Sequence, residues 1–309
     1  MNDYAALAIG IVSAGIGGEL FVRAAVGLGR WARVSPSIIG ATVAAFATSS
    51  PELSVAINAA LAGKPQISLG DVLGSNVVNV ALILGLALTI SGIQCPRDSV
   101  KRDFPIAAIV PVIIGILILD GVLSRFDGLL MLGMFFVWLV PVLIEARKQR
   151  NNAKEAVGKR NGWTAIILCI VGLAFLLTAG RLIVSGARGV AISFGLDEFV
   201  IGATVVAVGT SVPELATTIV AKIRGHDEVG LGTILGSNIF NCLFIVAIAA
   251  IIYPIAINLR ETKVAMAFGI LAVVFTFPAR RGFIERWRGA LLLSLYAAYI
   301  AAILMWQVP

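Results

Sequence analysis

Charged and catalytic side chains are scarce in this chain. Only 13% of its 309 residues are Asp, Glu, Lys or Arg, and His226 is its one histidine. Soluble domains carry about 25% charged residues, whereas 59% of this chain is hydrophobic and its mean hydropathy is +0.98. The composition excludes an ordinary soluble domain and predicts an integral membrane protein.

The few reactive residues exclude most enzyme and cofactor sites. Cys95, Cys169 and Cys242 have neither metal-site spacing nor the pattern of a disulfide framework. A serine protease would need a buried Ser–His pair, but His226 lies in a polar loop. An aspartyl protease needs two membrane aspartates, and Asp71 has no evident mate. We therefore expect a protein that is not an enzyme and that has no cofactor.

The net charge of +7 does not indicate nucleic-acid binding. The basic residues lie in short loops between apolar segments, where they set the orientation of a membrane protein. We expect membrane lipid around the chain, no nucleic-acid partner and no obligate protein partner.

Ten apolar runs have the length of a membrane span, roughly 17–25 residues. The first run contains Glu19 and Arg23 and lacks a small-residue cleavage site, so we interpret it as a retained span and not a signal peptide. The runs lie at about 4–28, 36–62, 67–93, 104–121, 126–145, 163–186, 198–221, 229–254, 261–278 and 288–307. The predicted fold is an all-α membrane protein with ten transmembrane helices.

Two long motifs occur twice at a constant offset of 162 residues. Residues 40–53 and 202–215 are identical at ten of fourteen positions, and residues 69–79 return as 231–241. This similarity indicates an internal duplication. The same offset matches Glu19 with Arg181, which could form a buried pair or could each reach water near a helix end.

The loop charges predict an inverted repeat. With the N-terminus outside, the inner loops hold seventeen Lys and Arg and the outer loops five, which is a strong positive-inside bias. Five helices per half make the second half enter the membrane in the opposite sense, so a shared site would lie near the midplane. We expect a first five-helix repeat (1–146), a cytoplasmic linker (147–162), a second five-helix repeat (163–309) and both termini outside.

Each copy carries a carboxylate inside an apolar helix. Such a charge is costly in hydrocarbon and marks a functional site. Thr48 and Glu52 are four residues apart and share a helix face, and Pro51 deprives the carbonyl of Ala47 of its helical partner. Hard cations prefer such an all-oxygen cluster. Thr210, Ser211, Pro213 and Glu214 repeat the arrangement.

The second motif is Gly-Ser-Asn-x-x-Asn. Ser75 shares a helix face with Asn79, as Ser237 does with Asn241. One interpretation is a packing helix with interhelical amide hydrogen bonds. The other is that these side chains add oxygens to the same cation cluster.

Both copies resemble the α-repeats of the sodium/calcium exchangers, within the wider cation/calcium antiporter superfamily. The motifs Ala-Thr-Ser-Ser-Pro-Glu, Gly-Thr-Ser-Val-Pro-Glu and the two Gly-Ser-Asn-x-x-Asn segments carry this resemblance. It covers nearly the whole chain, and the absence of a large regulatory loop makes the chain similar to the compact prokaryotic members.

The resemblance implies a set of ligands. Calcium would be held by Glu52 and Glu214 with the carbonyls of Thr48 and Thr210. Sodium would use both glutamates, the carbonyls of Ala45 and Ala207, and the hydroxyls of Ser49, Ser75, Ser211 and Ser237, with Asn79 and Asn241 lining the middle. Some relatives, notably potassium-dependent exchangers, carry Asp at the position of Asn241, so the asparagine argues against potassium co-transport. Relatives often carry Asn at the position of Asp71, and we expect Asp71 near the cavity mouth.

These residues predict an antiporter that exchanges sodium for calcium by alternating access in a prokaryotic plasma membrane. Two ionised glutamates are neutralised by one calcium ion or by several sodium ions, and an empty charged cavity is expensive to bury. Three sodium ions for one calcium would make exchange electrogenic. Glycine-rich first and sixth helices would slide over a rigid core. The alternatives are a calcium/proton or other divalent cation/proton antiporter, and a passive channel.

Overall fold

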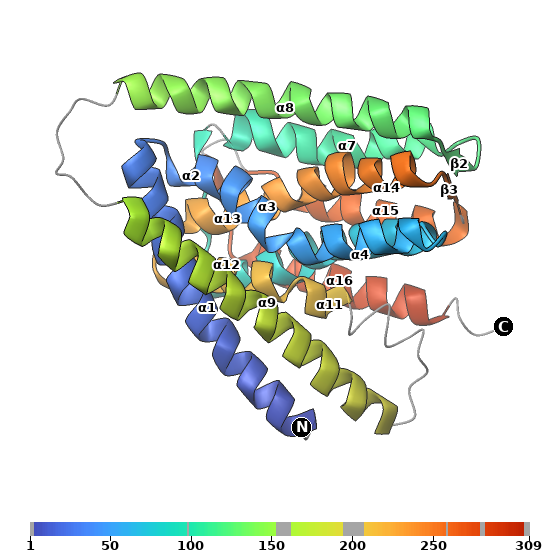
Figure 1. Cartoon of the computed structure of the whole chain (residues 1–309), viewed down its shortest axis with the longest axis horizontal. Coiled ribbons are helices and arrows are strands. Elements are labelled where there is room, and N and C mark those ends of the chain that lie inside the picture. Colours follow the sequence, from blue (N-terminus) through green and yellow to red (C-terminus); the bar gives the residue numbers. More distant parts are fainter. Residues whose placement is uncertain are drawn as a thin grey trace.

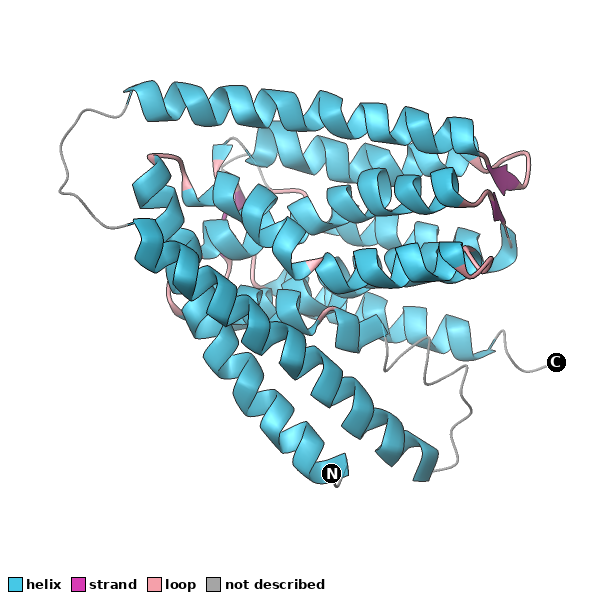
Figure 2. Ribbon diagram, viewed as in Figure 1, coloured by secondary structure: helices cyan, strands magenta, loops and turns pink. Residues whose placement is uncertain are grey.

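The computed structural model describes residues 3–97, 99–152, 162–193, 207–257, 259–278 and 282–305, and most of them are helical (Figure 2). The predicted all-α class needs one correction, because four two-residue strands are present: β1 (Ile93–Gln94), β2 (Val122–Leu123), β3 (Ile255–Ala256) and β4 (Phe283–Ile284). Runs of two residues carry no alternation of hydrophobicity that a sequence could reveal.

The helices follow the predicted apolar runs wherever residues are described. In the first half they are α1 (Asp3–Ala32), α2 (Pro36–Ile39), α3 (Ala45–Thr48), α4 (Ser50–Leu61), α5 (Gln66–Val77), α6 (Gly85–Ile90), α7 (Phe104–Leu117) and α8 (Arg125–Asn152). Three π-helical segments, η1 (Gly40–Ala44), η2 (Val78–Leu84) and η3 (Ser99–Asp103), interrupt them.

The described part of the second half has a similar order of helices, without a counterpart of η3. Its elements are α9 (Gly162–Ser193), α11 (Ala207–Thr210), α12 (Val212–Ile223), α13 (Asp227–Phe240), the π-helical η5 (Asn241–Ile245), α14 (Val246–Ile252), α15 (Leu259–Phe275) and α16 (Trp287–Met305). The beginning of the predicted run 198–221 lies outside the described residues.

Five of the described helical segments are long and apolar enough to cross a membrane, or six if the bent pair Pro36–Thr48 and Ser50–Leu61 is one span. Two further apolar helices, Thr262–Phe275 and Trp287–Ile303, are shorter. The chain is therefore a mostly helical membrane protein, and ten spans in two inverted repeats stay a prediction.

The long helices α1 and α9 lie side by side and run obliquely to the remaining helices (Figure 1). Glycine allows their backbones to touch, because a Cβ added to Gly17 would lie 3.0 Å from the Gly172 carbonyl oxygen, and one added to Gly172 would lie 2.8 Å from the Phe21 nitrogen. Gly10 and Gly186 face the partner helix in the same way. Close approach of this kind gives the van der Waals contact that holds membrane helices together.

The strands tie the two halves together at two places. β1 pairs with β4 through Ile93 and Ile284, and β2 pairs with β3 through Leu123 and Ile255. Each pair joins one strand from each half, and the 162-residue offset carries β1 onto β3. The two pairings are thus equivalent under exchange of the halves.

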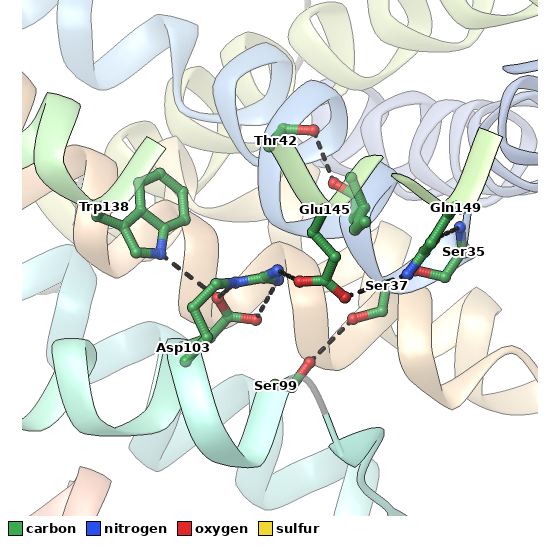
Figure 3. Close-up of polar contacts among 10 residues, drawn as sticks. Ser35, Ser37, Thr42, Ser99, Asp103, Trp138, Glu145 and Gln149 are labelled. Atoms are coloured by element: carbon green, nitrogen blue, oxygen red, sulfur yellow. Dashed lines mark hydrogen bonds and ion pairs between the residues drawn. The ribbon is translucent and has the colours of Figure 1, made fainter. Parts of the chain in front are cut away.

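One end of the molecule carries a polar network between α8, η3 and the segment before α2 (Figure 3). Arg102 donates to Asp103 at 2.7 Å and contacts Glu145, and Gln149 accepts a hydrogen bond of 2.8 Å from the Ser35 backbone. Ser37 and Ser99 join their hydroxyls at 2.9 Å. The bonds of Glu145 and Gln149 fasten α8 to η3 and to the segment before α2.

Candidate cation-binding site

The two Thr-Ser-x-Pro-Glu motifs break their helices as predicted. Ser49 (φ −83°, ψ 12°) separates α3 from α4, and Ser211 (φ −85°, ψ 7°) separates α11 from α12. The first break bends the helix by 45°. Proline two residues later explains each break, because it has no N–H to continue the helical ladder and its ring crowds the preceding turn.

The break brings the two halves together around Glu214. Ser49 Oγ donates to Glu214 Oε1 at 3.0 Å, and Ser237 Oγ donates to the same oxygen at 3.2 Å. Ser237 also lies 3.4 Å from the carbonyl oxygen of Ala45. Residues predicted to share one site from opposite halves are therefore in contact.

Glu52 has a different environment from its counterpart. Among the described residues, neither of its buried carboxylate oxygens has a hydrogen-bond partner, and the same holds for the hydroxyls of Ser75 and Ser211. These two serines match Ser237 and Ser49, the donors to Glu214, at the 162-residue offset. By this correspondence, Ser75 and Ser211 are the expected neighbours of Glu52.

Four asparagines join the halves through reciprocal hydrogen bonds. Asn76 Nδ2 donates to the Asn238 carbonyl at 3.3 Å, and Asn238 Nδ2 donates to the Asn76 carbonyl at 3.3 Å. Asn79 donates to Asn238 Oδ1 and Asn241 donates to Asn76 Oδ1, each at 3.0 Å. The predicted interhelical amide bonds are present, while the Oδ1 atoms of Asn79 and Asn241 are buried and have no partner among the described residues.

This chemistry fits hard cations. Buried polar groups are nearly always hydrogen-bonded, so a cluster of unpartnered oxygens marks a place for a ligand. The free atoms belong to Glu52, Glu214, Ser75, Ser211, Asn79 and Asn241, and all are oxygen, which calcium and similar ions prefer. Within the described part of the chain no three His, Cys, Asp or Glu side chains are placed to hold one metal ion.

The backbone oxygens need one correction. The sequence predicted that Pro51 would leave the Ala47 carbonyl free, but Ser50 Oγ donates to it at 2.8 Å. Thr48 is buried and donates to the carbonyls of Ala44 and Ala45 at 3.0 and 3.3 Å. Thr210 is half-buried and donates to the Ala207 carbonyl at 3.2 Å.

Two acids lie outside this cluster. Glu19 forms ion pairs with Arg23 and Arg224 and not with Arg181, whose side chain is exposed. Asp71 has a buried oxygen without a partner. The sequence analysis missed the role of Asn76 and Asn238 in joining the halves, although their identity in both copies of the second motif was the available signal.

Comparison with known proteins decides the family. The family model described as "Sodium/calcium exchanger protein" matches residues 3–144 and 164–305. The chain belongs to the sodium/calcium exchanger family. The resemblance inferred from its motifs is therefore confirmed.

Several known proteins are similar to this sodium/calcium exchanger family member over nearly the full length of both chains. CaxA of Alkalimonas amylolytica is 33% identical over 91% of this chain and 92% of its own. The sodium/calcium exchanger MaX1 of Methanosarcina acetivorans is 27% identical over 97% of this chain and 98% of its own. The solved sodium–calcium exchanger NCX_Mj, soaked with 10 mM Na+ and 10 mM Sr2+, is 29% identical with a TM-score of 0.83 and 97% coverage of both chains. The chain is a cation/calcium antiporter of the compact prokaryotic type.

Proposed function

We propose that this antiporter exchanges sodium for calcium, and that both ions use the cluster between Glu52 and Glu214. The observation that carries the proposal is the set of buried, unpartnered oxygens contributed by both halves. Calcium takes the two glutamates and the carbonyls of Thr48 and Thr210. Sodium takes the two glutamates, the carbonyls of Ala45 and Ala207 and the four serine hydroxyls, with Asn79 and Asn241 lining the middle.

We propose further that the two repeats, 1–146 and 163–309, are inverted and are joined by a cytoplasmic linker at 147–162. The loops rich in Lys and Arg gather at one end, which supports this orientation. Ser35 bonds Gln149, Arg102 contacts Glu145, Lys222 bonds the Gly92 carbonyl and Arg286 bonds the Thr89 carbonyl. Positive residues favour the cytoplasmic face, so the termini and the 62–65 loop are assigned to the outside.

The serine hydroxyls of the cluster favour sodium over protons as the coupling ion. A proton needs only the carboxylates, whereas Ser49, Ser75, Ser211 and Ser237 give a monovalent cation the neutral oxygens it requires. Potassium is not required, because Asn241 adds no third acid to the cluster.

The coupling-ion experiment uses calcium-45 uptake into proteoliposomes. An outward sodium gradient drives uptake under this proposal, without added potassium, and a pH gradient of equal size does not. Uptake driven by the pH gradient in the absence of sodium would establish the calcium/proton alternative. Saturable counterflow, with calcium loaded inside, separates an antiporter from a passive channel.

Exchange of three sodium ions for one calcium moves one net positive charge with the sodium. In sodium-loaded vesicles an inside-positive potential, imposed with valinomycin and inward potassium, then accelerates calcium uptake. An inside-negative potential slows it. Uptake that does not respond to the imposed potential contradicts the three-for-one ratio.

A further inference from the structure

A third carboxylate stands beside the cluster in one half only. Asp71 lies on α5, four residues before Ser75, so the two side chains share a face about 6 Å apart along the helix axis. Its equivalent in the other half is Thr233 on α13. The duplication therefore supplies an acid on one side of the cluster and a hydroxyl on the other.

The register of α4 against α5 fixes the depth of Asp71. These helices are joined by the four-residue segment 62–65, and Ser68 Oγ donates to the Ala56 carbonyl at 2.9 Å. One helical turn further from the loop, Asp71 is level with Glu52. One more turn brings Ser75 level with Ser49. Asp71 thus flanks the cluster on the side that carries the 62–65 loop.

Asp71 and Thr233 differ in how their oxygens are satisfied. Thr233 is fully buried and donates to the Val229 carbonyl at 2.8 Å. Asp71 Oδ2 is buried and accepts no hydrogen bond from any described residue. The register of α4 and α5 puts Asp71 and Glu52 at the same level, so two acidic side chains lie on neighbouring helices without a described counter-ion. A cation between them would offset the repulsion of the two carboxylates and give the unpartnered oxygen of Asp71 a partner.

We propose that Asp71 is an outer holding site for the divalent cation, used only on the 62–65 face. This inference rests on the proposed function. Calcium arriving from that face meets Asp71 together with Glu52, one helical turn before it reaches Ser49 and the Glu214 carboxylate that Ser49 bonds. Calcium arriving from the opposite face meets the neutral Thr233, so the two faces differ in apparent calcium affinity.

The test compares calcium–calcium exchange in right-side-out and inside-out membrane vesicles, which needs no coupling ion. We expect Asp71→Asn to raise the KM for calcium about three- to tenfold on the 62–65 face only, with the maximal rate unchanged. Asp71→Glu retains the charge and the parental KM. Asp71→Thr, which copies the other half, repeats the effect of Asn if the amide variant folds poorly.

Asp120→Asn is the matched control, because Asp120 is an exposed acid beside β2, which lies at the same end. It removes one charge from that end without touching the cluster. A KM that is unchanged on both faces, raised equally on both faces, or raised equally by Asp120→Asn overturns the inference. Failure of the parent chain to exchange calcium would instead refute the proposed function.

Discussion

Glu52 and Glu214 occupy equivalent positions in the duplicated sequence but differ in their hydrogen bonds. Glu214 accepts two serine hydroxyls, whereas Glu52 accepts none from the described residues. Both serines donate to Glu214 Oε1, so among the described residues only Oε2 of Glu214 lacks a donor, whereas both oxygens of Glu52 lack one. We therefore infer that an ion engages the Glu52 side first.

The serines on the Glu52 side test that inference. Ser75→Ala removes a free hydroxyl, so we expect a several-fold higher KM for sodium in proteoliposome exchange and a smaller change in the KM for calcium. Ser54→Ala is the control, because Ser54 is exposed on the same α4 helix as Glu52. Equal changes in the two sodium KM values would contradict a ligand role for Ser75.

Thiol reactivity tests the packing around Cys95, which lies in the connection that follows β1. Burial, with Asp227 nearby, raises the pKa of the Cys95 thiol to about 12. The thiolate fraction falls tenfold for each pH unit below the pKa, so at pH 7.5 we expect no significant maleimide labelling of Cys95 in the native protein and full labelling in denaturant. Mass spectrometry of labelled peptides measures both. Rapid native labelling would contradict the burial of Cys95.

The sequence predicted the functional residues whose chemistry depends on their local surroundings. Glu52, Glu214 and the serines stood out because polar side chains are rare in apolar helices. The bonds from Asn76 to Asn238 were not predictable in detail, because they depend on the register of helices 162 residues apart. For the same reason, the unequal bonding of the two glutamates leaves no trace in two nearly identical motifs.

At the scale of elements, proline predicted the helix breaks but nothing predicted the π-helical turns. η2 and η5 begin at Val78 and Asn241, one turn beyond Ser75 and Ser237. Such wide turns occur mostly at functional sites. Here they include Asn79 and Asn241, whose Oδ1 atoms are buried and accept no hydrogen bond from a described residue. No residue type in η2 or η5 requires the wider π-helical turn, so we attribute these turns to tertiary packing.

The contact between η1 and α13 depends on glycine. A Cβ at Gly236 would lie 2.4 Å from the Ala41 carbonyl oxygen, which is backbone and cannot move alone. We expect Gly236→Ala to destabilise the protein by about 1–3 kcal/mol, seen as a lower midpoint of thermal unfolding in detergent.

Gly133→Ala on α8 is the matched control for that substitution. Nothing lies within 4 Å of a Cβ at Gly133, and alanine favours a helix over glycine. Its unfolding midpoint should equal or exceed that of the parent. A midpoint of Gly236→Ala that matches the parent would contradict the close approach of η1 and α13.

At the scale of the whole molecule, α1 and α9 form one unit. Gly10, Gly17, Gly172 and Gly186 face the partner helix, whereas Gly18 and Gly180 face α12 and α11. The predicted sliding of glycine-rich helices over a rigid core is therefore best tested as movement of the pair.

Two disulfides distinguish movement of the pair from movement of each helix. A Cβ at Gly18 lies 3.0 Å from Val220 Cγ2, and one at Gly10 lies 2.7 Å from Ile183 Cγ1. In a cysteine-free background, oxidation of Gly18→Cys with Val220→Cys fixes α1 to the core and should stop exchange. Oxidation of Gly10→Cys with Ile183→Cys joins α1 to α9 and should preserve it. Exchange that survives the first disulfide contradicts the sliding mechanism.

The internal duplication predicted more of the architecture than any single segment of the sequence did. It predicted that residues 40–53 and 202–215 would meet, and Ser49 does contact Glu214. The strand pairings β1–β4 and β2–β3 are also related by exchange of the two halves. The sequence did not predict these strands, because each is only two residues long. Symmetry is readable from sequence, whereas the contacts that carry it depend on three-dimensional register.

The most direct measurement is equilibrium binding of calcium-45 to the purified protein with Glu52→Gln and Glu214→Gln, using Glu228→Gln, a partly exposed acid in the first turn of α13, as control. We expect one calcium per parent chain and per control chain, and loss of binding in each cluster variant without a lower unfolding midpoint. Undiminished binding in either cluster variant would contradict joint capture of the ion by both halves.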